Sequence, residues 1–263
     1  MEKEDILKIP LKEQENLKEL FQLLEKNGME QEKKQVLQMA DYIDSMETKM
    51  EDVLSELKSM REQLSGIENQ SFRTKAEKIV AAVEGKLGEA KEALGNLKRA
   101  FLGKVEQALQ AGKTKGKEDL SGILKTIRLP QMTLRVQHLL KGAVRTADQG
   151  IMKLGDMADE LHAARQHLGN AGRTLTGRKM RKAVSRDPER GAVYEVQRLV
   201  FQSMVSMERM ERRTENLLER MDRLSAKEEK GRTSVRKSIR ELRADQPTVQ
   251  EPLQKQRSET VRG

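Results

Sequence analysis

The sequence predicts an all-α protein in which long amphipathic helices form coiled coils or an elongated helical bundle, followed by a disordered C-terminal tail. Two observations favour this fold class. Charged residues make up 35% of the 263 residues and aromatic residues only 2%, a balance typical of helices with one apolar stripe. Apolar residues also recur in alternating steps of three and four over several long stretches, which is the heptad spacing of packed helices.

Residues 1–28 are expected to contain a short lead helix. Pro10 can open a helix, because its fixed φ suits the first helical turn. The pair Asn27-Gly28 supplies the left-handed residue that commonly ends one. The apolar face between these signals has helical spacing and consists of Leu17, Leu20, Phe21 and Leu24.

The strongest structural signal is an acidic heptad helix in residues 29–70. Its apolar seam advances by three and four without a break, and no Gly or Pro occurs from residue 29 to residue 65. The seam residues are Val36, Met39, Ile43, Met46, Met50, Val53, Leu57, Met60, Leu64 and Ile67. Met side chains are frequent among them, and they pack adaptably but specify geometry poorly. The number of helices that meet at this seam is therefore left open.

The middle of the chain is expected to hold further helices with weaker boundaries. Residues 71–110 form an amphipathic helix interrupted by glycines, each of which costs about 1 kcal/mol of helix stability relative to Ala. Residues 111–170 comprise a basic break, a short helix that ends or kinks at Leu129-Pro130, and a long helix whose apolar stripe ends at Leu168. Residues 171–187 form a basic linker.

A second clean heptad helix is expected in residues 188–225, after the capping pair Asp187-Pro188. Its apolar seam residues are Val193, Val196, Val200, Met207, Met210, Leu217, Met221 and Leu224. Ser203 and Thr214 also fall in this seam, where polar residues can fix helix register. Residues 226–263 have little apolar content and are predicted to be a largely disordered basic tail.

Each amphipathic helix must bury its apolar stripe against a partner, and two arrangements are open. The helices of one chain can pack together as an antiparallel bundle, or a helix can pair with the same helix of another chain. The expected partners are therefore a second copy of the chain, as a homo-oligomer, or another helical protein.

Charge is distributed unevenly along the chain. Residues 1–70 carry a net negative charge, although the whole chain has a net charge of +9. The densest basic run is a candidate nucleic-acid contact and consists of Arg173, Arg178, Lys179, Arg181, Lys182, Arg186 and Arg190. Such density favours phosphate binding through counterion release. Because no aromatic side chain lies among these charges to stack on a base, a solvated linker is the favoured alternative.

No catalytic, cofactor or metal site is expected. The chain has no Cys and three His, and the single Asp159-x-x-His162 pair lacks the matching ligands that a helical metal site needs. Gly112-Lys113-Thr114 lacks the earlier Gly of a phosphate-binding loop. A cytoplasmic location is expected and membrane association is not, because the sequence has neither a secretory signal nor an apolar stretch long enough to span a bilayer.

Three stretches in the N-terminal part carry a family resemblance: residues 16–28 (NLKELFQLLEKNG), 42–46 (YIDSM) and 53–57 (VLSEL). They resemble an uncharacterised family of helical coiled-coil proteins, a domain of unknown function encoded by conjugative and other mobile elements of Gram-positive gut bacteria. The resemblance implies a bacterial cytosol and a mobile-element context. It implies no activity and no site residues.

The expected function is that of a non-enzymatic structural or adaptor protein, which acts through coiled-coil self-association or capture of a helical partner. The alternative is a nucleic-acid-associated accessory protein that uses the basic linker and tail for non-specific binding of DNA or RNA. Charge reversal at the basic run separates the two, because it should leave an adaptor's assembly unaffected and should abolish a salt-sensitive nucleic-acid complex.

Overall fold

The computed structural model describes residues 9–114, 116–185 and 192–244, with the side chains of the last range from 193 to 223. The described residues form helices and no strand, which confirms the predicted all-α class. The elements are a short 3-10 helix η1 (Leu11–Glu13) and the α-helices α2 (Glu15–Lys26), α3 (Glu30–Leu64), α4 (Gln70–Thr114), α5 (Lys117–Thr126), α6 (Pro130–Leu175) and α7 (Ala192–Ala244). The chain divides into two units, Met1–Glu219 and Arg220–Gly263, and the helical bundle belongs to the first.

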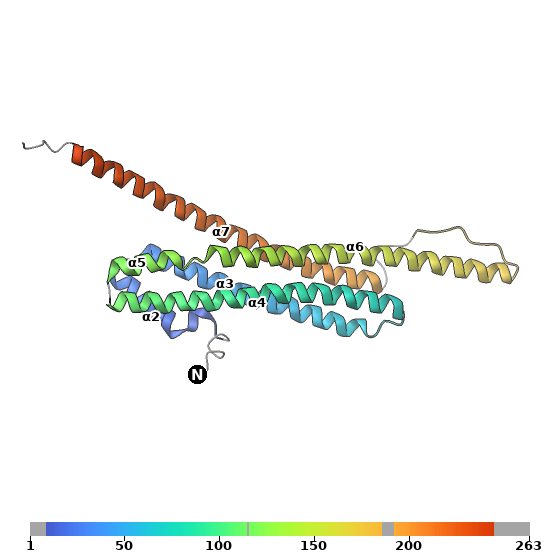
Figure 1. The fold of residues 1–263 in the computed structure, drawn as a ribbon. Helices are drawn as coiled ribbons and strands as arrows, with labels where there is room; N and C mark the ends of the chain where they lie inside the picture. The colour runs from blue at the N-terminus through green and yellow to red at the C-terminus, as the bar shows by residue number, and fades with distance from the viewer. Residues whose placement is uncertain (1–8, 115, 186–191, 245–263) are drawn as a thin grey trace, which may run out of the picture. The chain divides into compact units, whose positions relative to one another are not determined.

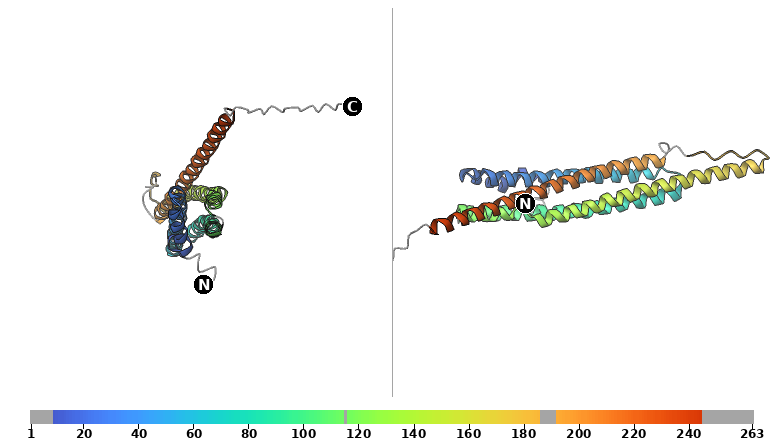
Figure 2. Two further views of the ribbon diagram at one scale, coloured as in Figure 1. Left: turned by 90° about the vertical axis from the view of Figure 1, so that its left-hand side faces the viewer. Right: turned by 90° about the horizontal axis from the view of Figure 1, so that it is seen from above.

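Helices α3, α4, α6 and the first part of α7 form this bundle, and successive helices run in opposite directions (Figures 1 and 2). Between α3 and α4, Arg61 Nη1 lies 3.1 Å from Glu84 Oε2. Between α6 and α7, the Gln197 amide donates a hydrogen bond of 3.0 Å to the carbonyl oxygen of Ile151. Of the two open arrangements, the antiparallel bundle within one chain is the one that the structure contains.

The lead helix α2 ends where the sequence predicts and packs on α4. Gly28 follows it with a φ of 65°, in the left-handed region that favours glycine. A Cβ added to Gly112 of α4 would lie 2.3 Å from Leu23 Cδ2. Gly112 lies within α4, and a larger residue there would have to displace the end of the Leu23 side chain.

The predicted seam of α3 forms its buried face. Every seam residue from Val36 to Leu64 is at most 3% exposed. Ile67 is the exception, because α3 ends at Leu64 and Ile67 lies half-buried in the turn to α4. The Asn69 side chain accepts a hydrogen bond of 3.0 Å from the backbone N–H of Phe72, which caps the next helix. The predicted segment 29–70 therefore contains a helix and a turn.

Helix α4 is continuous through the four glycines that were predicted to interrupt it. Nothing lies within 4 Å of a Cβ added to any of them, and these glycines are Gly85, Gly88, Gly95 and Gly103. The buried stripe of α4 outweighs their low helix propensity, because most helical stability in proteins comes from packing of the apolar face. Gly150 of α6 differs, since a Cβ there would lie 2.5 Å from Ile79 Cγ2, so it lets α6 approach α4 closely.

Two helices extend further than predicted. Helix α6 begins at Pro130 as expected, but it continues to Leu175 and enters the segment 171–187 that was read as a linker. Helix α7 continues to Ala244, so residues 226–244 of the predicted disordered tail are helical. Both differences have one physical reason, because adding residues to an existing helix avoids the cost of nucleation. Residues 245–263 lie outside the described residues.

The second predicted seam lies on α7. Its buried members are Val196, Val200, Met207, Met210 and Met221, and Val193 and Leu217 are half-buried. The side chain of Leu224 lies outside the described residues. The two polar seam residues, Ser203 and Thr214, are fully buried.

A buried hydrogen bond joins α3 to α7. Tyr42 Oη lies 2.8 Å from Thr214 Oγ1, and the Thr214 hydroxyl donates to the carbonyl oxygen of Met210 at 2.9 Å. Tyr42 is therefore the donor in the bond between the helices. Burial raises the pKa of Tyr42 to about 12.

We expect the variant Tyr42→Phe to lose stability less steeply than the parent chain at alkaline pH. Between pH 10 and 12 the unfolded chain loses the Tyr42 proton while the folded chain keeps it, so the free energy of unfolding falls as pH rises. The contribution of one such group is about 1.4 kcal/mol per pH unit. Urea unfolding at a series of pH values measures the slopes, with Tyr194→Phe as the control. Equal slopes for the parent and Tyr42→Phe would contradict the expectation.

Candidate partner-binding surface

The C-terminal part of α6 extends beyond the bundle. Ala158, at 3% exposed, is its last buried residue, and residues 159–175 are exposed or half-buried. In Figures 1 and 2 this yellow part of α6 passes beyond the turn that joins α3 to α4. We call residues 159–185 the arm, and its non-helical part, residues 176–185, the strap.

The strap folds back along α6. Gly177 has a φ of 71°, and the backbone N–H of Arg178 bonds to the carbonyl oxygen of Arg173 at 2.8 Å. This left-handed cap reverses the chain. Asn170 then accepts from the backbone N–H of Arg181 at 2.9 Å and donates to its carbonyl oxygen at 3.0 Å. Nearer the base of the arm, the Gln166 amide donates to the carbonyl oxygen of Val184.

The predicted basic residues gather on the arm. From residue 161 to residue 185 there are six basic residues and no acidic one: Arg165, Arg173, Arg178, Lys179, Arg181 and Lys182. Arg173 is half-buried and its Nε donates to the carbonyl oxygen of Lys179 at 2.9 Å. The four basic side chains of the strap are exposed. The last two predicted contacts, Arg186 and Arg190, lie outside the described residues.

An uncovered apolar seam also runs along the arm. Leu161, Ala164, Leu168, Ala171 and Leu175 follow one another in steps of three, four, three and four. Leu168 is 74% exposed and Leu175 is 89% exposed. Leu175 lies three heptads beyond Leu154, which is fully buried in the bundle. The seam therefore continues the bundle-facing stripe of α6 into a region where no described helix covers it.

The strap leaves this seam open. The residues that bond to it are His162, Gln166, Asn170 and Arg173. At about 100° per residue, these positions lie on roughly the opposite side of α6 from Leu168. One face of the arm thus carries the strap with its outward basic side chains, and the other face is apolar.

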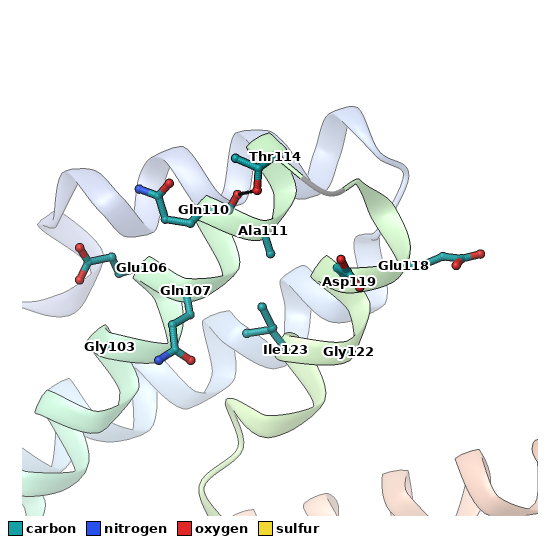
Figure 3. A pocket seen from close by; sticks show the side chains of 10 residues that line it. All are labelled: Gly103, Glu106, Gln107, Gln110, Ala111, Thr114, Glu118, Asp119, Gly122 and Ile123. Carbon is teal, nitrogen blue, oxygen red and sulfur yellow. Dashed lines mark hydrogen bonds between the residues drawn. The ribbon is translucent and has the colours of Figure 1, made fainter.

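Apart from the arm, a groove lies between α4 and α5 (Figure 3). It has a volume of about 830 Å³, and Glu106, Glu118 and Asp119 line it together with Gly103 and Gly122. In the part of the chain that the structure describes, no group of three or more His, Asp or Glu side chains could hold a metal ion.

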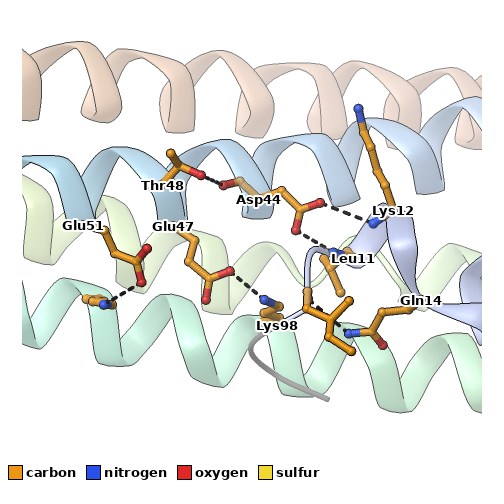
Figure 4. A network of polar contacts seen from close by, with 10 residues as sticks. Leu11, Lys12, Gln14, Asp44, Glu47, Thr48, Glu51 and Lys98 are labelled. Atoms are coloured by element: carbon orange, nitrogen blue, oxygen red, sulfur yellow. Dashed lines mark hydrogen bonds and ion pairs between the residues drawn. The ribbon is translucent and has the colours of Figure 1, made fainter. Parts of the chain in front are cut away.

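A network of polar contacts joins the N-terminal segment to the bundle (Figure 4). Asp44 accepts the backbone N–H of Leu11 at 2.8 Å. Nearby, Glu47 Oε2 lies 2.6 Å from the ammonium of Lys98, whose side chain is 2% exposed. These contacts satisfy a backbone N–H donor and a buried charge, which are structural roles.

The family comparison covers nearly the whole chain. A family model described as "Family of unknown function (DUF6674)" matches residues 13–261. The chain belongs to this family. No curated protein and no solved structure matches it. Among the described residues, no helix combines the length and the apolar character needed to cross a membrane.

Among its described residues, the DUF6674 chain therefore has an arm with exposed apolar side chains on one face and exposed basic side chains on the other. The sequence pattern predicted its basic residues and its apolar stripe as far as Leu168, but not Leu175, because residues 171–187 were predicted to form a linker. The seven-residue spacing from Leu161 to Leu168 and on to Leu175 is the signal that predicts the continuation of the seam. Most residues of the two predicted heptad seams are buried within the chain itself.

Proposed function

We propose that this chain is a non-enzymatic structural or adaptor protein, in which the bundle supports the arm and the arm's apolar seam binds a helical partner. The observation that carries the proposal is the heptad spacing of two strongly exposed leucines, Leu168 and Leu175. Burial of a leucine side chain contributes about 1.5–3 kcal/mol. A partner helix that covers both would therefore gain binding energy and specificity from the seam.

The burial of the heptad seams of α3 and α7 supports the arm as the binding surface. The seam residues of α3 and most of those of α7 are buried within the bundle. They can associate with a further helix only if the bundle opens, which would expose the same apolar area that binding buries. The arm offers its seam without that cost.

We further propose that the protein acts in the bacterial cytoplasm as an accessory of a mobile element. The N-terminal stretches 16–28, 42–46 and 53–57, which resemble helical proteins encoded by such elements in Gram-positive gut bacteria, support this context. Coiled-coil association through the arm fits a chain in which heptad spacing recurs in several helices.

Nucleic-acid binding is a second candidate function, and the charge of the arm favours it. Arg178, Lys179, Arg181 and Lys182 are exposed on a strap whose backbone is bonded to α6. A row of fixed basic side chains suits a phosphate backbone. The apolar seam on the other face has no role in such a complex, which is why we rank this function second.

Binding of a labelled synthetic heptad peptide with Leu and Ala at its seam positions tests the first proposal. We expect Leu168→Asp with Leu175→Asp to weaken binding at least about tenfold, because each change places a carboxylate in the apolar contact. The bundle should keep its stability, since both residues are exposed. The matched control is His167→Asp with Thr174→Asp, on the same helix but off the seam. Fluorescence anisotropy measures the binding.

A DNA duplex in the same assay separates the two functions. The adaptor proposal would be rejected if the peptide bound equally well to the seam variant and to the control. A DNA complex that dissolves with rising salt, and that is lost when Arg178, Lys179, Arg181 and Lys182 are changed to Gln, would instead support nucleic-acid binding. Changing the exposed Lys58, Lys75, Lys78 and Arg135 to Gln gives a control with the same net charge.

A further inference from the structure

The order of leucine and alanine in the apolar seam of the arm is nearly the same in both chain directions. About Leu168 as its centre, Leu161 and Leu175 are each seven residues away, and Ala164 and Ala171 lie four and three residues away. Two such seams placed antiparallel would set leucine opposite leucine at both ends. We propose that the partner of the arm is a second copy of this chain, bound antiparallel with a two-fold axis at Leu168. This inference rests on the proposed function and names its partner.

Charge complementarity supports the antiparallel direction. Asp159 and Glu160 at the base of the arm are exposed, as is Asp156 just before it, and the tip of the arm carries the exposed Arg178 and Lys179. An antiparallel pair brings the acidic base of each copy to the basic tip of the other. A parallel pair would place base against base and tip against tip, where like charges repel each other.

The strap supports a dimer because it does not obstruct the seam. It is bonded to the side of α6 opposite Leu168, so it does not lie between the two seams. The small residues Ala164 and Ala171 also lie in the seam and allow two helices to approach closely. The two arms can therefore meet along their apolar faces without moving the strap.

The two-fold symmetry limits the assembly to a dimer. Each copy uses the same surface for the contact, so an isologous pair closes and leaves no free seam for a third copy. The contact spans only two heptads and is at the small end of specific interfaces. We therefore expect a reversible dimer with a Kd in roughly the micromolar range.

Cysteine cross-linking in the full chain tests both the partner and its direction, because the natural sequence has no Cys. We expect Leu168→Cys to form a disulfide-linked dimer under mild oxidation, since this residue lies on the two-fold axis. Leu161→Cys and Leu175→Cys should each cross-link poorly alone and should form a mixed dimer when combined. His167→Cys, an exposed neighbour off the seam, gives the background rate. Non-reducing electrophoresis measures the products.

Two results would overturn the proposal. Efficient cross-linking of Leu161→Cys alone and of Leu175→Cys alone would show a parallel pair. Cross-linking of every variant at the rate of His167→Cys would show that the seam does not bind a second copy. If the synthetic heptad peptide still bound to the seam in that case, the adaptor function would stand and only the second copy would be excluded. If neither bound, both proposals would fail.

Discussion

Replacing Leu57 and Leu64 of α3 with Asp should unfold the bundle. Both leucines are at most 1% exposed, so each change removes a packed side chain and buries a carboxylate. Loss of a buried leucine alone costs about 2–5 kcal/mol, and a buried unpaired charge adds to this cost. Two such changes approach or exceed the typical stability of a domain, about 5–15 kcal/mol. Circular dichroism should show the loss of most helical signal.

The control for this variant is Ser55→Asp with Ser59→Asp, which adds the same charge to exposed positions on the same helix. It should keep the helical signal and a cooperative melting transition. If the Leu57 and Leu64 variant also kept both, the packing of α3 inside this bundle would be wrong. Protein concentration supplies a further check, because the stability of a bundle within one chain does not depend on concentration, whereas pairing of α3 between chains would make it do so.

The seam of α3 shows how far the sequence could predict the fold. Its residues from Val36 to Leu64 were selected by spacing alone, and all of them are buried. The breaks at Gly28 and Leu129-Pro130 were also predicted, because a left-handed residue or a proline has a local effect on the backbone. Features that depend on local spacing and local backbone geometry could thus be read from the chain directly.

The choice of partner for each helix could not be predicted in this way. Heptad spacing gives the face that a helix buries but not the helix that covers it. The bond between Tyr42 and Thr214 joins residues 172 positions apart, and only the folded chain brings them together. For the same reason the sequence left open whether these helices pair within one chain or between chains.

The arm shows a different limit of sequence reasoning. Its basic residues were predicted from composition, but the predicted seam ended at Leu168 because a glycine follows at position 169. Single glycines cost about 1 kcal/mol each in a helix, and a 46-residue helix such as α6 can accept that cost once it has formed. Weak helix formers near the end of a long helix therefore say little about where it stops.

Replacing Glu47 with Ala should destabilise the bundle by about 2–4 kcal/mol. The Lys98 side chain is 2% exposed and its ammonium lies 2.6 Å from Glu47 Oε2. Removing one partner of a buried ion pair costs about 3–5 kcal/mol, because the remaining charge loses a favourable contact in a buried place. Glu47 is 30% exposed, so solvent screening should reduce this value somewhat. Urea unfolding measures the change.

The neighbouring pair of Glu51 and Lys91 offers a matched control, since it joins the same two helices at 2.9 Å but is exposed on both sides. Glu51→Ala should cost about 0–1 kcal/mol. Adding Lys98→Met to Glu47→Ala should restore most of the lost stability, because Met fills the same space without a charge. Equal costs for Glu47→Ala and Glu51→Ala would contradict a buried charge at Lys98. A double variant no more stable than Glu47→Ala would show that the Glu47 side chain acts through packing and not through the ion pair.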